Sequence, residues 1–224
     1  MNIVVIHGQS HKGSTYRLSK LLMDNLLEKS DSAKEFYTND IPPCIGCFSC
    51  ITNGEEFCPH YSAIAPIAAA IEKSDVIIVN SPNYCMEMSG QLKTFFDHMA
   101  YRWISHRPPP SMKNKIGVAI TTTAGTGARG TAKSIARQMF YWNVAKTYCL
   151  SFAVSAMNWD SVKTERKSKL ERKSKQTAKK IKKTLARVKP GIKSIFMFNI
   201  MRSMQKKSTW NQIERDYWEN NGWI

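Results

Sequence analysis

Four of the six cysteines in this 224-residue chain fall within fifteen residues. They follow the pattern Cys-x2-Cys-x2-Cys-x7-Cys and are Cys44, Cys47, Cys50 and Cys58. A hydrophobic core gives no reason to cluster thiols, whereas closely spaced thiolates are typical of metal or iron–sulfur ligand loops and of redox sites. Structural zinc usually uses two separated cysteine pairs, so a compact loop suits zinc less well. The pattern therefore leaves open a [4Fe–4S] cluster and a thiol loop without metal. Zinc or a redox disulfide is a less favoured alternative.

A second candidate site is the polar segment Gly8-Gln-Ser-His-Lys-Gly-Ser-Thr15, which joins an apolar run to a helical pattern. Backbone N–H groups at a helix N-terminus carry partial positive charge and bind anions. Ser10, Ser14 and Thr15 add hydroxyls and Lys12 adds a positive charge, which predicts a phosphate site. The nucleotide P-loop pattern and the three-glycine dinucleotide fingerprint are both absent. For this segment alone, a polar turn without ligand is an equally good interpretation.

Two further loops follow apolar runs in the same way. Because parallel strands present their carboxyl ends at one edge of a sheet, all three loops are expected to meet there. A phosphate cradle with two loops that offer backbone groups and a flat side chain, Tyr84, suits flavin mononucleotide (FMN). The candidate residues of these two loops are Pro82, Asn83, Tyr84, Cys85, Met86, Thr122, Thr123, Ala124 and Gly125.

The elements that must position these loops alternate between short apolar runs and helical patterns. This alternation predicts an α/β fold with a doubly wound parallel sheet of five strands. Strands are expected at 2–7, 34–37, 75–80, 116–121 and 147–154. Helices are expected at 14–29, 64–73 and 91–101, and a fourth helix follows the loop 122–130 and ends near residue 142.

The three loops together resemble those of flavodoxin-like NAD(P)H-dependent FMN reductases. The segments that carry the resemblance are 8–15, Ser81-Pro-Asn-Tyr84 with Gly90-Gln-Leu-Lys93, and Thr122-Thr-Ala-Gly125. The cysteine segment resembles the iron–sulfur flavoprotein branch of that superfamily. The resemblance covers residues 1 to 155. It implies noncovalent FMN, hydride transfer from NAD(P)H, and a homodimer or tetramer. Gln9 departs from the serine that many relatives carry there.

By matching positions, the resemblance also implies roles for the loop residues. Ser10, Lys12, Ser14 and Thr15 would hold the FMN phosphate. The segments 82–86 and 122–125 would flank the isoalloxazine ring. In the iron–sulfur branch, four such cysteines bind a [4Fe–4S] cluster that passes electrons to FMN one at a time.

The positive charge of the chain is concentrated in one segment. Residues 163–189 hold thirteen Lys and Arg and two Glu, which accounts for eleven of the sixteen net positive charges. We expect two parts, an FMN-binding domain over 1–158 and a basic helical extension over 159–224. A solvated helix with one apolar stripe on the α/β domain is the favoured interpretation of the extension. Contact of 163–204 with an anionic membrane comes second, and nucleic acid is unlikely because few aromatics interleave the basic residues.

These observations predict an FMN-dependent oxidoreductase that moves hydride from NAD(P)H to flavin and then to a small acceptor. The acceptor classes are a quinone, a nitro or azo compound, a free flavin or a metal ion. The alternative is a flavodoxin-like electron carrier with a [4Fe–4S] cluster at 44–58. With no signal peptide and no apolar run long enough for a membrane span, we expect a cytoplasmic location, peripheral at the membrane if the extension binds lipid.

Overall fold

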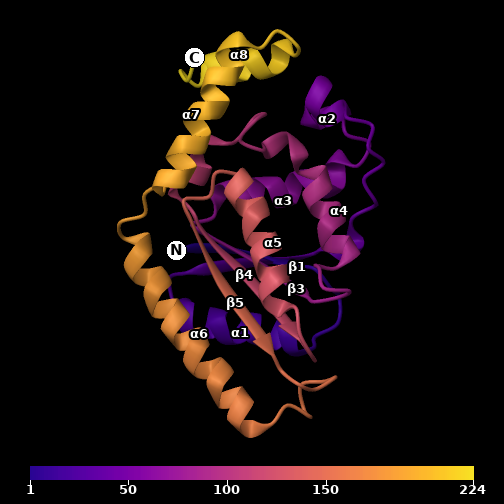
Figure 1. Ribbon diagram of the computed structural model, residues 1–224, viewed down its shortest axis with the longest axis vertical. Coiled ribbons are helices and arrows are strands. Elements are labelled where there is room, and N and C mark those ends of the chain that lie inside the picture. Colours follow the sequence, from indigo (N-terminus) through magenta and orange to yellow (C-terminus); the bar gives the residue numbers. More distant parts are fainter.

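The computed structural model describes residues 1–224 and contains one five-stranded, all-parallel sheet (Figure 1). The strand order is β2-β1-β3-β4-β5, so the chain reverses direction across the sheet between β1 and β3. The strands are β1 (Asn2–His7), β2 (Ser32–Tyr37), β3 (Val76–Pro82), β4 (Ile116–Thr123) and β5 (Lys146–Ala153). The predicted doubly wound sheet is therefore confirmed.

Helices cover both faces of this sheet. One face packs against the apolar sides of α3, α4 and α5, and the other against α1 and α6. The helices are α1 (Ser14–Leu26), α2 (Ser49–Thr52), α3 (Tyr61–Lys73), α4 (Gly90–His98), α5 (Ala128–Tyr141), α6 (Thr164–Leu185), α7 (Ile192–Lys207) and α8 (Gln212–Asn220). The inner strands are buried on both faces, which explains their continuous Val and Ile runs.

The predicted elements agree with the observed ones to within a few residues at their ends. β2 begins at Ser32, two residues before the expected start, because Asn2 to His7 of β1 pair with all six of its residues. α1 ends at Leu26, where Leu27 turns to an extended conformation, and so it does not reach Lys29.

The basic segment forms α6, a 22-residue helix with one buried stripe. Leu170, Ala178 and Ile181 pack in the same apolar cluster as Leu18 and Leu22 of α1. The charged residues face outward, since nearly all lysines of α6 are exposed. The favoured interpretation of this segment, a charged helix with its single apolar stripe on the α/β domain, matches this packing.

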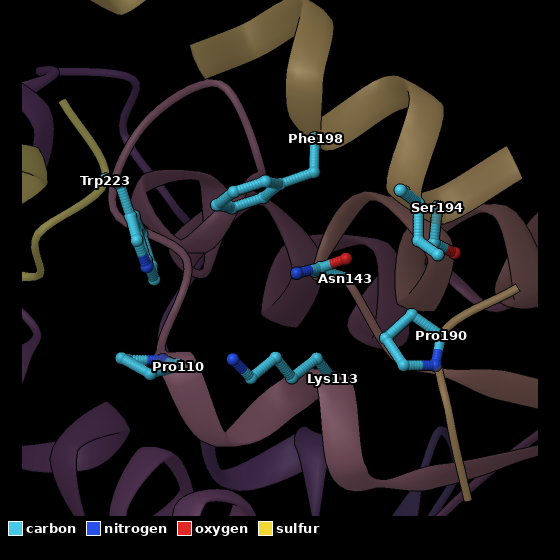
Figure 2. Close-up of a pocket in the computed structure, with 8 residues that line it drawn as sticks. Pro110, Lys113, Asn143, Pro190, Ser194, Phe198 and Trp223 are labelled. Carbon is cyan, nitrogen blue, oxygen red and sulfur yellow. The ribbon is translucent and has the colours of Figure 1, made fainter. Parts of the chain in front are cut away.

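The last two helices, α7 and α8, lie at one end of the molecule, beyond the end of the sheet (Figure 1). Between α7 and the segment 110–113 there is a cavity of about 260 Å³. Phe198 and Trp223 border it, with the side chains of Asn143 and Lys113 nearby (Figure 2). None of the three predicted ligand loops lines this cavity. No helix in the structure combines the length and the apolar character that crossing a bilayer requires.

Candidate functional site

The carboxyl ends of β3 and β4 and the N-terminus of α1 surround a second cavity, of about 380 Å³. Cavities of this size are within the range of small-molecule and cofactor sites. The segment after β5 lines a further side of it. The lining residues are His11, Gly13, Ser14, Thr15, Pro82, Asn83, Tyr84, Thr122, Thr123, Ala124, Val154, Ala156 and Met157.

The N-terminus of α1 is open to an anion at this cavity. Gly13 is its N-cap residue and has no side chain to accept from the helix N–H groups, and the first turn holds no carboxylate. The first N–H groups of a helix have no partner within the helix. At α1 they combine with the hydroxyls of Ser14 and Thr15 beside the cavity. This arrangement matches the donor set that a phosphate group requires.

Hydrogen bonds fix the three loops relative to one another. The Thr15 and Thr122 hydroxyl oxygens lie 2.6 Å apart and are buried. The backbone N–H of Asn83 donates to the Thr122 carbonyl at 3.0 Å, and the Asn83 amide donates to the Thr126 carbonyl at 2.9 Å. The cavity is therefore preformed by contacts within the chain.

The first loop begins with a close approach of two backbones. The N–H of Gly8 donates to the Asn80 carbonyl at 2.7 Å, and a Cβ on Gly8 would lie 2.9 Å from that same oxygen. The next residue, Gln9, is 5% exposed, and both polar atoms of its amide are buried without a partner. Buried amides normally have partners. Gln9 thus leaves a donor and an acceptor of this loop without a partner inside the protein, although the residue does not line the cavity.

The second loop ends in a tight hairpin turn. Tyr84 and Glu87 exchange backbone hydrogen bonds, both of 2.9 Å, and the two residues between them have positive φ angles, 48° for Cys85 and 66° for Met86. Such turns favour Asn-Gly, because asparagine tolerates a positive φ and glycine adopts it freely, whereas most other residues are strained there. The sulfur of Met86 lies where a Cβ on Gly127 would meet it, so the turn packs on the third loop. Tyr84 is half exposed at the cavity wall.

Of the four loop cysteines, Cys44, Cys50 and Cys58 are half-buried and Cys47 is exposed. Burial and then the neighbouring thiols of Cys58, Cys44 and Cys47 raise the pKa of Cys50 to about 11. Hydrogen bonds from Ser49 lower the pKa of the exposed Cys47. Gly46 and Phe48 both have positive φ, so the backbone curls between the cysteines. The loop holds no disulfide.

Two histidines stand beside the last of these cysteines. The Sγ of Cys58 lies 3.8 Å from Nδ1 of His98, whose Nε2 donates to the Pro42 carbonyl at 2.8 Å. Ligand atoms of Cys58, His60 and His98 all lie within 4.8 Å of one another. Sequence spacing gave no sign of this group, because His98 is forty residues from Cys58 and reaches it only through α4.

The model for NADPH-dependent FMN reductases matches residues 1–158. The chain belongs to the NADPH-dependent FMN reductase family. An iron–sulfur flavoprotein of Archaeoglobus fulgidus is 31% identical over 143 residues, 61% of this chain and 62% of that protein. One of Clostridioides difficile is 25% identical over 238 residues, covering all of both chains. The solved NADH:FMN oxidoreductase, in its apo form, superposes with a TM-score of 0.56 at 16% identity, over 80% of this chain and 89% of the other.

Most of the predicted loop residues in this FMN reductase family member meet at one cavity. Eight of the thirteen line it, and Ser10, Lys12, Cys85, Met86 and Gly125 do not. The Lys12 amine lies 5.7 Å from the ring centre of Tyr16 instead. Sequence reasoning missed His11, Gly13 and the segment 154–157. The position of that segment directly after β5, at the same sheet edge, was the available signal.

Proposed function

We propose that the chain is an FMN-dependent oxidoreductase that oxidises NAD(P)H and reduces a small acceptor such as a quinone, a nitro or azo compound, a flavin or a metal ion. The observation that carries the proposal is the cavity at the carboxyl edge of the sheet, with an uncapped helix N-terminus at one wall. Membership of the NADPH-dependent FMN reductase family supports it.

FMN supplies the redox chemistry, because it accepts hydride and passes the electrons on. The residues of this chain bind and orient it. The N–H groups at the start of α1, with Ser14 and Thr15, would hold the phosphate. Asn83, Tyr84 and the backbone of 122–124 would border the ring. The predicted contacts of Ser10 and Lys12 require these exposed side chains to turn toward the ligand.

The test is titration of FMN-free protein with FMN, followed by stopped-flow mixing with NADH or NADPH. We expect one FMN per chain and bleaching of its absorption by one of the two nucleotides. Thr15→Val removes a hydroxyl from the cradle and is expected to weaken FMN binding about tenfold, the cost of one hydrogen bond to a charged group. Thr177→Val, on the far helix α6, is the matched control. Absence of FMN binding would refute the proposal.

The second candidate function is electron transfer through a [4Fe–4S] cluster held by Cys44, Cys47, Cys50 and Cys58. The specific observation is that the backbone curls at Gly46 and Phe48 between four cysteines, none of which forms a disulfide. Such a donor set fits the cluster, because bound iron stabilises thiolates that otherwise repel one another. Iron and sulfide assays on anaerobically purified protein test it: about four irons per chain support the candidate, and none refutes it.

We also propose a homo-oligomer. Exposed apolar residues recur every fourth position along α7, at Ile192, Phe196, Ile200 and Met204. One side of a helix that is apolar and uncovered marks a contact surface. Light scattering on Phe196→Ser and wild-type protein tests whether a second copy covers it. A wild-type monomer that sediments with anionic vesicles would instead support membrane contact through 163–204.

A further inference from the structure

The cysteine loop is hydrogen-bonded by residues far away in the sequence, at two consecutive carbonyls. Arg107 donates through Nη1 to the Ile51 carbonyl at 3.0 Å and through Nη2 to the Cys50 carbonyl. Asn211 donates through its amide to the same Ile51 carbonyl at 2.9 Å. Both carbonyls belong to α2, which has only four residues. The last carbonyls of a helix have no intrahelical partner, so these external donors hold the end of α2.

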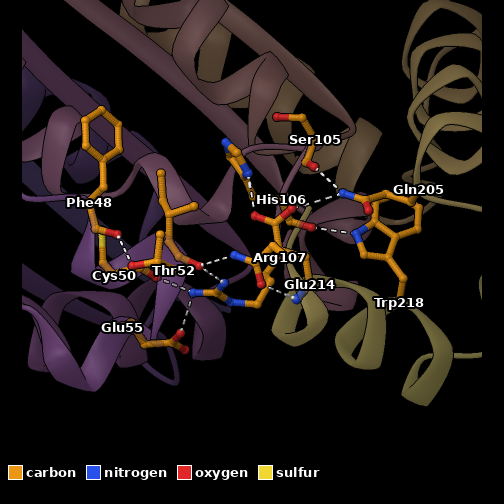
Figure 3. A network of polar contacts seen from close by, with 12 residues as sticks. Phe48, Cys50, Thr52, Glu55, Ser105, His106, Arg107, Gln205, Glu214 and Trp218 are labelled. Carbon is orange, nitrogen blue, oxygen red and sulfur yellow. Dashed lines mark hydrogen bonds and ion pairs between the residues drawn. The ribbon is translucent and has the colours of Figure 1, made fainter. Parts of the chain in front are cut away.

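Arg107 is a buried group whose position is fixed on several sides. It is 5% exposed and also forms an ion pair with Glu55 at 3.2 Å. Its guanidinium carbon lies 5.7 Å from the ring centre of Tyr101. Figure 3 shows the guanidinium between Glu55 and the loop backbone. A buried guanidinium is stable only when it is paired and hydrogen-bonded. The contacts between Arg107 and the cysteine loop therefore stabilise both the side chain and the loop backbone.

The segment that carries Arg107 is itself held by α7 and α8. Gln205 donates to the Ser105 carbonyl at 2.7 Å, the Trp218 indole to the His106 carbonyl at 2.5 Å, and the Tyr217 hydroxyl to the Pro108 carbonyl at 3.0 Å. Three donors thus bind three carbonyls within four residues.

An ionisable pair lies at the centre of this contact. Glu214 of α8 is fully buried, and its carboxylate lies 2.6 Å from Nδ1 of His106 and 3.2 Å from the Gln205 amide (Figure 3). A buried carboxylate is costly unless it is paired and hydrogen-bonded. Glu214 therefore links α8 to the segment 105–108 through His106 and to α7 through Gln205.

We infer that α7 and α8 are a positioning unit for the cysteine loop, with Asn211 and Arg107 as the positioning residues. Together they hold the backbone of Cys50 so that its side chain stays half-buried. The effect on thiol protection is a property of the polypeptide alone. The effect on cluster retention rests on the second candidate function above.

Asn211→Ser separates this role from helix capping. Asn211 is the N-cap residue of α8 and accepts from the Glu214 N–H. Serine is an equally good N-cap, so the variant keeps α8 and loses the donor to Ile51. Asn199→Ser, on the exposed side of α7, makes the same change where no loop contact exists. Arg107→Lys is the second test variant, since lysine cannot donate in the same fork geometry.

The measurement is the alkylation rate of each cysteine in reduced, iron-free full-length protein, followed by mass spectrometry of the peptides. We expect Cys50 to react about five to ten times faster in Asn211→Ser, the opening caused by loss of one hydrogen bond. Cys149, on β5, is the internal reference and should keep its rate, as should Cys50 in Asn199→Ser.

Two results would overturn the inference. One is an unchanged Cys50 rate in both Asn211→Ser and Arg107→Lys. The other is equal acceleration at Cys149, which indicates general loosening. If Arg107→Lys does not fold, Asn211→Ser decides alone. In parallel, iron per chain after anaerobic reconstitution should fall in Asn211→Ser while bound FMN stays constant. Failure of the wild type to take up iron removes the cluster candidate, but leaves the alkylation test intact.

Discussion

The turn at Cys85 and Met86 stores conformational strain that substitution should release. Both residues have left-handed backbone angles, and Met86 is 62% exposed. A left-handed conformation costs an ordinary L-residue about 1–2 kcal/mol. Asparagine tolerates it, and glycine adopts it without a steric cost but loses about 0.5–1 kcal/mol through greater freedom in the unfolded chain. The double variant Cys85→Asn/Met86→Gly should therefore gain about 1–2 kcal/mol.

The assay is thermal unfolding of FMN-free protein, because bound FMN would add stability by mass action. For a chain of this size, the gain corresponds to a Tm increase of about 2–8 °C. Cys85→Ala is the control, since it removes the thiol but keeps a Cβ at the strained position. A double variant with a Tm no higher than that of Cys85→Ala would refute the argument that the turn is strained.

Three further outcomes follow from the structure. Gly8→Ala places a methyl group 2.9 Å from the Asn80 carbonyl oxygen, so we expect a Tm loss of several degrees together with weaker FMN binding in a fluorescence titration. In iron-free protein at pH 8, Cys47 should be alkylated first and Cys50 last, because with a pKa of about 11 only about one Cys50 thiol in a thousand is ionised. Mass spectrometry of partly alkylated protein gives the order of labelling, and early labelling of Cys50 would contradict the prediction. Burial lowers the pKa of His7 below its ordinary 6.5, so His7 takes up a proton more readily in the unfolded chain than in the folded one. The free energy of unfolding should therefore fall as the pH drops through about 6.5. Urea unfolding at pH 7.5 and 5.5 checks this, and His7→Gln should show a smaller pH dependence.

The fold was predictable from the sequence because its strands are short Val and Ile runs separated by helical patterns. The three ligand loops were predictable for the same reason, since loops after parallel strands meet at one edge. The same rule also applies to the segment 154–157 after β5, but its residues include no glycine and little polarity, so the sequence did not mark it as a ligand loop. Nor was the group of His60 and His98 beside Cys58 predictable, because it depends on how α4 packs.

The relation of α8 to the cysteine loop was also beyond sequence reasoning. Asn211 and Ile51 are 160 positions apart, and hydrogen bonds between a side-chain amide and a backbone carbonyl leave no trace in residue spacing. Glu214 shows the same limit. Nothing in the pattern around it distinguishes a fully buried carboxylate from the exposed acids of a surface helix.

The basic helix α6 has a consequence for how the molecule avoids self-association through its sheet. β5 is an outer strand, with free backbone groups along one side. α6 runs alongside it in the opposite direction, tied by the Tyr148 and Thr184 hydroxyls at 2.7 Å and by Arg166 donating to the Ala153 carbonyl at 2.8 Å. Uncovered edge strands are templates for pairing between chains, and lysines near an edge discourage it. A chain cut at residue 158 would lose these contacts along β5, so we expect it to pair through this edge and aggregate more readily than the full chain.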